Sequence, residues 1–327
     1  MVGEEKLQGH LLEGWMELDT KTGKFLEKLK RMLDWKGLHG RLEKLYSKGQ
    51  GRPGYAPEIL FRMWLLERIY TVSDVRVVEE VNDRISFREF VGIPFGEEVP
   101  DDTTLVKFRQ RIREAGAEEA LWGWFEEQVS RQGLSLKKGS VVIVDATLVA
   151  SHHRKESRDQ QGNPLEPEAG TGKRGPLKVV HGYNMCIGYN PQTQLGGRPV
   201  VVAGNVNDIH LFPQVLTGKE GTVTADCGFD AQLNRKVLRE GGMKDGIMYQ
   251  PRRKKVLSPK EQEHNLRWKK VRSRIESFFG CLKQWRGLRK LRVAGIVRVK
   301  QFLEMSIMAE NMVRMVKRMG GVSMQPE

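Results

Sequence analysis

Three acidic residues, far apart in the chain, stand where their side chains could perform chemistry. Asp145 follows four consecutive β-branched apolar residues in "GSVVIVDATLVAS", a pattern typical of a buried strand. Asp226 ends the apolar stretch "TVTAD", and Glu276 lies in "RIESFFG" within a basic segment. Because an ionised carboxylate is rarely buried without a cation or strong donors beside it, Asp145 requires a partner.

A divalent metal ion shared by the three carboxylates is the partner that this pattern favours. Mg²⁺ and Mn²⁺ prefer oxygen ligands and accept them from carboxylates, water and phosphate. Two such ions about 3.5–4 Å apart can activate the attacking oxygen and stabilise the leaving oxygen in a phosphoryl transfer. Asp145, Asp226 and Glu276 are therefore predicted to hold two Mg²⁺ or Mn²⁺ ions, provided that the two Asp-bearing strands are neighbours in a sheet.

Basic residues accompany Glu276 on one face of a predicted helix that covers about residues 259–288. At helical spacing, this face carries Lys269, Arg272, Glu276 and Lys283. The opposite stripe is apolar and consists of Ile275, Phe278, Leu282 and Trp285. Arg272 then either forms an ordinary i,i+4 pair with Glu276 or, in a metal site, addresses phosphate oxygens together with it.

The positive charge of the chain is concentrated in one block. Residues 251–300 hold 17 Lys and Arg against three Glu, which already accounts for the net charge of +14. Such a block indicates an anion-binding face, for which nucleic acid is the usual partner, whereas a solvated helix face is the alternative. The candidates for binding phosphate are Lys269, Arg272, Lys283, Arg252, Arg253, Lys254 and Lys255.

Alternating strands and helices are predicted after residue 139. Strands are expected at 140–150, 179–190, 198–208, 221–230 and 246–253. A short helix is expected between the third and fourth strands, and longer helices at 231–242, 259–288 and 299–319. This order predicts an α/β fold in which hairpin pairing of the first strands precedes crossover connections.

Two regions precede this α/β domain. Residues 1–50 are expected to form an N-terminal arm with a short amphipathic pattern. Residues 51–136 contain four short helical patterns after a Gly- and Pro-rich turn, which indicate a compact all-α domain. The helix-turn-helix-like spacing fits a DNA-binding domain, but it fits a simple packing unit as well.

Residues 152–178 separate the first two predicted strands. The segment is polar, rich in Gly and Pro and almost without apolar residues, so it is predicted to be a mobile basic loop. It is either an excursion without a role or a flap that orders on a polyanion. His152 and His153 at its start, together with Asp208 in "NVNDIHLF", are candidate accessory residues of the site.

Three short motifs resemble the signature of a known family. "VDATLV", "TADCGFD" and "RSRIESFFGCLKQW", the last with Arg272-x3-Glu276-x6-Lys283, resemble the DDE signature of bacterial insertion-sequence transposases of insertion-sequence family five. Upstream, "GRPGYAPEILFRMWLLERIY" and "PDDTTLVKFR" resemble the N-terminal helical domain of that family. The family usually has Tyr three residues before the Arg of the motif. This chain has Lys269 there, so the contribution of that position stays open.

The resemblance implies a fold, an activity and partners. It implies an RNase H-like mixed sheet flanked by helices, formed by residues 137–319 between the all-α domain and a tail at 320–327. It implies that Asp145, Asp226 and Glu276 are the catalytic residues and hold two divalent ions. The expected partner is double-stranded DNA, with a homodimer cutting and joining strands at terminal inverted repeats and target DNA.

Two alternatives to a transposase stay open from the sequence. An RNase H-like nuclease would hydrolyse DNA without joining strands, and a domesticated descendant would bind DNA without cutting it. The presence of all three carboxylates argues against the second alternative.

Other features bound the class of protein. The start of the chain has neither a secretory signal nor a long apolar stretch, so we expect a cytoplasmic protein that is nucleoid-associated when bound and has no membrane contact. The spacing of Cys186, Cys227 and Cys281 fits neither a zinc site nor a disulfide framework.

Overall fold

The computed structural model describes residues 20–46, 54–135, 141–174, 178–251 and 256–320. The chain divides into two compact units, Met1–Gln132 with Met308–Glu327 and, separately, Gly133–Ile307. The division falls within helix α12 (Ile296–Arg318), whereas the sequence placed the end of the second domain at residue 319. Over the described ranges, no helix is both long and apolar enough to cross a membrane.

The first unit is helical, as the sequence predicts. Before α12 it contains α1 (Lys21–Met32), α2 (Trp35–Leu42), η1 (Glu43–Leu45), α3 (Pro57–Tyr70), α4 (Asp74–Asp83), α5 (Ile85–Val91), α6 (Asp102–Glu114) and α7 (Glu118–Arg131). Helices α1 and α2 lie in the region that was expected to be an arm. They belong to the packed unit because Phe25, Leu29 and Trp35 are buried, with the Trp35 ring 5.9 Å from that of Trp124.

Local caps and one ion network order these helices. Ser73 and Asp101 cap α4 and α6 by accepting a hydrogen bond from the backbone amide three residues on. Arg109 of α6 donates to Glu67 of α3 at 2.6 Å and to Asp74 of α4 at 2.5 Å. Since charges with so little exposure are tolerated only when paired, this guanidinium fixes how three helices meet.

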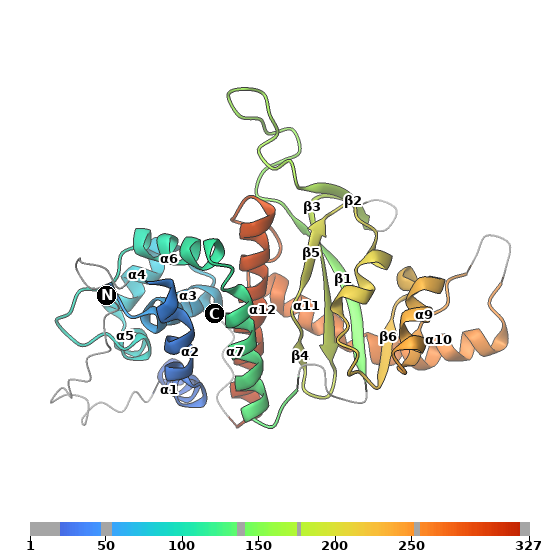
Figure 1. Ribbon diagram of the computed structural model, residues 1–327, viewed down its shortest axis with the longest axis horizontal. Helices are drawn as coiled ribbons and strands as arrows, with labels where there is room; N and C mark the ends of the chain where they lie inside the picture. Colours follow the sequence, from blue (N-terminus) through green and yellow to red (C-terminus); the bar gives the residue numbers. More distant parts are fainter. Residues whose placement is uncertain (1–19, 47–53, 136–140, 175–177, 252–255, 321–327) are drawn as a thin grey trace. The chain divides into compact units, whose positions relative to one another are not determined.

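The second unit is built on one mixed sheet (Figure 1). Its strands are β1 (Val142–Ala150), β2 (Gly170–Arg174), β3 (Lys178–Asn190), β4 (Leu195–Gly196), β5 (Val200–Ala203), β6 (Thr222–Ala225) and β7 (Lys244–Ile247). The order is β2-β3-β1-β6-β7, and β4 and β5 also pair with β3. Strand β1 is antiparallel to β3 and parallel to β6, so the first and fourth predicted strands are neighbours, as the site requires.

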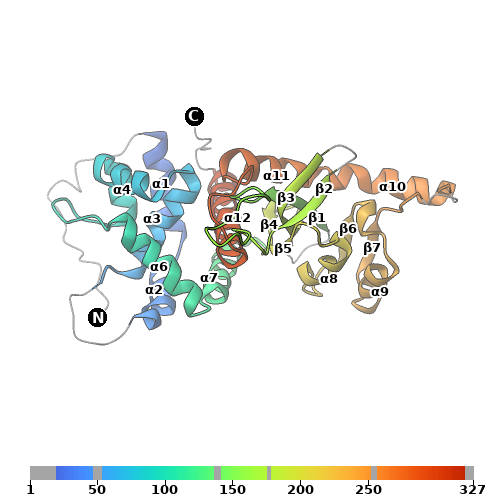
Figure 2. The same ribbon diagram turned by 90° about the horizontal axis from the view of Figure 1, so that it is seen from above.

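Helices cover both faces of this sheet. They are α8 (Phe212–Val215), α9 (Gln232–Glu240), α10 (Pro259–Arg272) and α11 (Arg274–Trp285), with the 3-10 helices η2 (Asp208–His210) and η3 (Cys227–Phe229). Val144 of β1 belongs to a core with Phe212 of α8 and Leu238 of α9. On the other face, Phe278 of α11 contacts Tyr189 of β3, with ring centroids 5.3 Å apart. Figure 2 shows α8 and α9 on one side of the sheet and α11 on the other. The predicted mixed α/β sheet flanked by helices is thus confirmed.

The single helix predicted for residues 259–288 is two helices that meet at Ser273. At the break, the Ser273 hydroxyl donates to the carbonyl of Lys270 at 3.0 Å, and the amide of Glu276 donates to the carbonyl of Ser273 at 3.1 Å, the spacing of a 3-10 turn. Helix α10 begins with a capping box formed by Ser258 and Glu261, and none of its residues is buried. Helix α11 buries Ile275, Phe278 and Leu282 of the predicted apolar stripe, whereas Trp285 is only partly buried. The break therefore separates a polar helix from a helix that anchors in the core.

The segment after β1 has more structure than the predicted loop. It contains β2, which pairs with β3. Asp159 accepts a hydrogen bond from the backbone amide of Asn163 at 2.8 Å and so closes a turn. The buried Glu166 accepts one from the backbone amide of His153 at 2.7 Å. These polar contacts order a sequence that has few apolar side chains to bury, and its mobility stays a prediction.

Gly196 allows α11 to approach the sheet, which leads to a prediction. A Cβ atom at Gly196 would stand 2.6 Å from the buried ring of Phe278. We expect Gly196→Ala to lower the free energy of unfolding by about 1–3 kcal/mol, the usual cost of overpacking, in chemical denaturation. The control is Gly280→Ala on α11, where a Cβ meets nothing within 4 Å and helix propensity gains up to about 1 kcal/mol. Equal effects of the two substitutions would contradict the packing argument.

Candidate active site

The register of the sheet brings Asp145 and Asp226 side by side. Val144 of β1 matches Ala225 of β6 in the parallel ladder, so the two Asp residues follow at matching positions. Matched residues of parallel strands point to the same face of the sheet, which here is the face of α11. The Asp226 carboxylate also accepts a hydrogen bond from the Gly228 amide at 2.7 Å at the start of η3. Backbone pairing thus determines where both carboxylates stand.

The surroundings of Asp145 disfavour its negative charge. The side chain is only 15% exposed. Burial, opposed by Arg272 and assisted by the charges of Asp226 and Asp208, raises the pKa of Asp145 to about 6. The backbone amide of Ala146 donates to this carboxylate at 2.9 Å and favours the ionised form. Asp145 is therefore a carboxylate that gains from any additional positive charge placed beside it.

Asp208 contributes to the same electrostatic environment. Asn184 of β3 donates to the Asp208 carboxylate at 2.5 Å and to the carbonyl of Val206 at 3.1 Å. Burial raises the pKa of Asp208, the hydrogen bond from Asn184 lowers it, and the charge of Asp226 raises it. The candidate accessory residue Asp208 thus interacts electrostatically with Asp226 and Asp145.

Arg272 links two carboxylates that come from different elements. From the last position of α10, its guanidinium donates from Nη1 to Oδ2 of Asp145 and from Nη2 to Oε1 of Glu276, both at 3.2 Å. The i,i+4 pair considered from the sequence is formed, and the same side chain also reaches the sheet. The Arg272 side chain is 21% exposed and that of Glu276 is 62% exposed. In this structure, Arg272 is the cation that meets the charge of Asp145.

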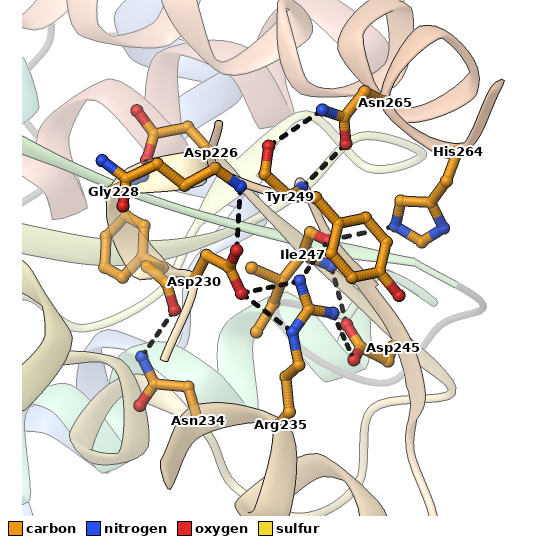
Figure 3. Close-up of polar contacts among 12 residues, drawn as sticks. Asp226, Gly228, Asp230, Asn234, Arg235, Asp245, Ile247, Tyr249, His264 and Asn265 are labelled. Atoms are coloured by element: carbon orange, nitrogen blue, oxygen red, sulfur yellow. Dashed lines mark hydrogen bonds and ion pairs between the residues drawn. The ribbon is translucent and has the colours of Figure 1, made fainter. Parts of the chain in front are cut away.

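Polar contacts attach α10 to the end of β7. The side-chain amide of Asn265 donates to the carbonyl of Tyr249 at 2.9 Å and accepts from its amide at 2.8 Å. Nε2 of His264 lies 3.0 Å from the carbonyl oxygen of Ile247. Figure 3 shows both side chains directed at this stretch of chain. Since α10 buries no residue, these contacts set the position of the helix and so that of Arg272.

Arg235 of α9 holds the strand end to which α10 is attached. Its guanidinium donates to Asp230 at 3.0 Å and to Asp245 at 2.6 Å, and it lies 4.1 Å from the ring centroid of Tyr249. Asp230 in turn accepts from the backbone amide of Gln250 at 2.8 Å. The two carboxylates converge on one guanidinium beneath the aromatic ring, as Figure 3 shows. This network stabilises the chain segment to which α10 is attached.

The remaining predicted residues have other neighbours. Lys269 is exposed on α10, and Nζ of Lys283 lies 6.0 Å from the ring centroid of Phe279. The rings of His152 and His153 contact each other, and Nδ1 of His152 lies 3.3 Å from the carbonyl oxygen of Leu291. The predicted phosphate-binding residues that fall outside the described ranges are Arg252, Arg253, Lys254 and Lys255.

The predicted metal ligands fit a hard divalent cation by their chemistry. Carboxylate oxygens are the ligands that Mg²⁺ and Mn²⁺ prefer, and Asp145 gains from a nearby cation. Among the residues that the structure describes, however, no three His, Cys, Asp or Glu side chains are placed to hold one ion together. The guanidinium of Arg272 lies between Asp145 and Glu276 instead. The shared-ion arrangement stays a prediction, and it requires Arg272 to move.

Three residues that build the site were not identified from the sequence, namely Asn184, Arg235 and Asn265. Asn184 carried a usable signal, since a polar residue inside the apolar strand "VVHGYNMCIGYN" must find a hydrogen-bonding partner when buried. Arg235 and Asn265 lie in polar helices where many residues of the same type face solvent. Their roles depend on the three-dimensional contacts and leave no pattern in the sequence.

The perturbed pKa of Asp145 predicts a pH-dependent stability. Because folding raises this pKa from 3.8 to about 6, the stabilising contribution is complete below about pH 4 and is lost as the pH rises through about 6. For protein stripped of metal, we expect Asp145→Asn to unfold with a free energy about 3 kcal/mol higher than the parent near pH 8. This advantage should largely disappear near pH 4. Urea denaturation at both pH values measures the difference, and an advantage independent of pH would contradict the assignment.

Comparisons with known proteins identify the family of this chain. Residues 136–312, more than half of the chain, match the family described as transposase DDE domain, and residues 15–111 match the family described as transposase domain (DUF772). Among solved structures, the chain is similar to piggyBac transposase in a synaptic complex with hairpin DNA, determined by cryo-EM. That similarity has a TM-score of 0.46 and 10% identity over 94% of this chain and 77% of that chain. The chain belongs to the transposase DDE domain family and is an insertion-sequence DNA transposase, an enzyme of metal-dependent DNA strand cleavage and transfer.

Proposed function

We propose that this transposase uses Asp145, Asp226 and Glu276 to cut and join DNA strands at the terminal inverted repeats of an element of insertion-sequence family five. The observation that supports this assignment best is the parallel ladder of β1 and β6, whose last pair, Val144 and Ala225, directly precedes Asp145 and Asp226. Arg272 then connects Asp145 to Glu276 on the same face of the sheet. These contacts support the assignment of the three carboxylates to one site.

The three carboxylates would hold divalent ions, and we propose two Mg²⁺ or Mn²⁺ ions per site. When bound, such ions stabilise the charge on the attacking and leaving oxygens of an in-line displacement at phosphorus. Asp145 contributes most to attracting them, because its ionised form is buried and disfavoured until a cation is added. Asp208, held by Asn184, adds negative charge nearby and is proposed as an accessory residue.

The proposed reaction has two displacement steps of the same kind. Water first attacks a phosphodiester at the end of the element, and the bond to the 3′-oxygen breaks to release a 3′-hydroxyl. This hydroxyl then attacks a phosphodiester of the target, whose own 3′-oxygen leaves. We assign Arg272 and Lys283 to stabilising negative charge on the phosphate, with no covalent bond between protein and DNA.

The exposed surface of α10 supports a DNA-binding role. This helix buries no residue, and its exposed cations are Lys260, Arg267, Lys269 and Lys270. Such a cationic surface suits a phosphate backbone rather than individual bases. We propose that it binds DNA beside the active site and that the helical unit also binds DNA. Two inverted repeats, each engaged by one protomer, would make the active form a homodimer on DNA.

The role of Glu276 can be tested by removing its charge. Glu276→Gln keeps the shape of a side chain that is 62% exposed, so we expect the fold to be unaffected. Cleavage and joining of DNA that carries the element ends should fall by about two orders of magnitude or more, as when a transition-state stabiliser is lost. Strand cleavage in Mg²⁺ or Mn²⁺ is the measurement. Glu263→Gln, an exposed carboxylate of α10, serves as the control and should cleave at the parent rate.

The role of α10 can be tested through the salt dependence of binding. Changing Arg267, Lys269 and Lys270 to Gln should weaken the binding of all DNA sequences alike. The slope of log K against log salt should decrease by about 0.9 for each lost phosphate contact. The control changes three exposed lysines outside α10, Lys219, Lys236 and Lys244, and should leave the slope as in the parent. Equal slopes for both triple variants would argue that α10 is only a solvated surface.

A further inference from the structure

We propose that Arg272 is an internal counter-ion of the active site, which competes with divalent metal ions for Asp145 and Glu276. The inference rests on the proposed function, since it takes both carboxylates as metal ligands. Its starting point is the position of the guanidinium, which donates to one oxygen of each carboxylate and lies between them. A cation that bridged the same two carboxylates would need the space and the lone pairs that Arg272 uses.

The geometry of these bonds makes Arg272 a replaceable partner. Both distances are 3.2 Å, longer than the roughly 2.7–2.9 Å of a strong charge-assisted hydrogen bond. Each carboxylate receives one bond from the guanidinium instead of the two of a bidentate pair. Arg272 therefore offsets the charges of Asp145 and Glu276 without using their full bonding capacity.

The electrostatics explain why a counter-ion is needed. Asp145 is 15% exposed and has Asp226 and Asp208 near it, so its charge is costly when no cation is beside it. Arg272 supplies that cation from within the chain, at 21% exposure. A guanidinium and a divalent ion repel each other strongly over such short distances when poorly solvated. Metal binding between Asp145 and Glu276 and the observed position of Arg272 therefore exclude each other.

The position of Arg272 in the chain allows the exchange. It is the last residue of α10, directly before the break at Ser273, and its long side chain reaches the carboxylates from the edge of the site. Rotation of this side chain would release both carboxylates while the contacts of Asn265 keep α10 attached. Metal binding must therefore displace Arg272 from the carboxylates, which costs free energy. This cost is lower when another anion binds the guanidinium.

The test measures Mn²⁺ binding to the full-length protein without DNA, by electron paramagnetic resonance of free Mn²⁺. We expect Arg272→Gln to bind Mn²⁺ at least about tenfold more tightly than the parent, since one charge-assisted hydrogen bond commonly has that effect or more. Arg272→Lys retains the charge without the planar fork and should bind with intermediate affinity. Arg274→Gln removes the same charge from an exposed position two residues away and should match the parent within about twofold.

The outcomes separate this inference from the proposed function. Parental or weaker Mn²⁺ binding in the Arg272 variants would overturn the competition and show that Arg272 organises the ligands. If Arg272→Gln does not fold, the lysine variant alone decides in the same way. Asp145→Asn tests the proposed ligand set, because it should lose Mn²⁺ binding. Parental binding by Asp145→Asn would refute the ligand assignment itself, whereas its loss together with unchanged Arg272 variants would refute only the counter-ion.

Discussion

The parallel ladder between β1 and β6 ends at Val144 and Ala225, so two carboxylates, Asp145 and Asp226, directly follow its last pair, and the rest of the candidate active site accommodates this constraint. The charge of Asp226 disfavours the ionised form of Asp145, and neighbouring groups offset the two negative charges. Gly228 supplies an amide to Asp226, and Ala146 supplies one to Asp145. The negative charge of Asp145 is offset more strongly by Arg272, which belongs to helix α10 and not to the sheet.

The position of Arg272 beside Asp145 depends on a series of polar contacts that begins on the opposite face of the sheet. Arg235 holds the end of β7 through Asp230 and Asp245, and that strand end offers its backbone to Asn265. Helix α10 is therefore positioned by hydrogen bonds, while α11 is positioned by its apolar stripe. The positions of Arg272 on α10 and Glu276 on α11 thus have different physical origins, although the two residues are close in the chain.

The elements that bury apolar side chains could be predicted from the sequence. Asp145 is a charged residue in a predicted apolar strand, and this conflict identified it without any knowledge of its neighbours.

The break at Ser273 and the contact between Arg272 and Asp145 could not be predicted. The sequence around Ser273 contains neither Pro nor Gly to indicate a break, and the contact of Arg272 depends on how a polar helix docks. Strand β7 was expected at 246–253 but is Lys244–Ile247, since the polar Asp245 gave no sign of a strand. In the helical unit, Phe25, Leu29 and Trp35 are core residues of a region that was assigned to an arm.

The absence of buried residues along α10 has an evolutionary consequence. Substitutions at exposed positions away from special contacts usually change stability little, so most of this helix can vary without affecting the fold. His264 and Asn265 attach the helix to the end of β7, and the capping box of Ser258 and Glu261 stabilises its first turn. Selection can therefore change the charge on the outer surface of α10 while the carboxylates in the sheet remain unchanged. Related enzymes can therefore differ in the charge of this single helix, and with it in the strength of the DNA binding that we propose for α10, at little cost to folding.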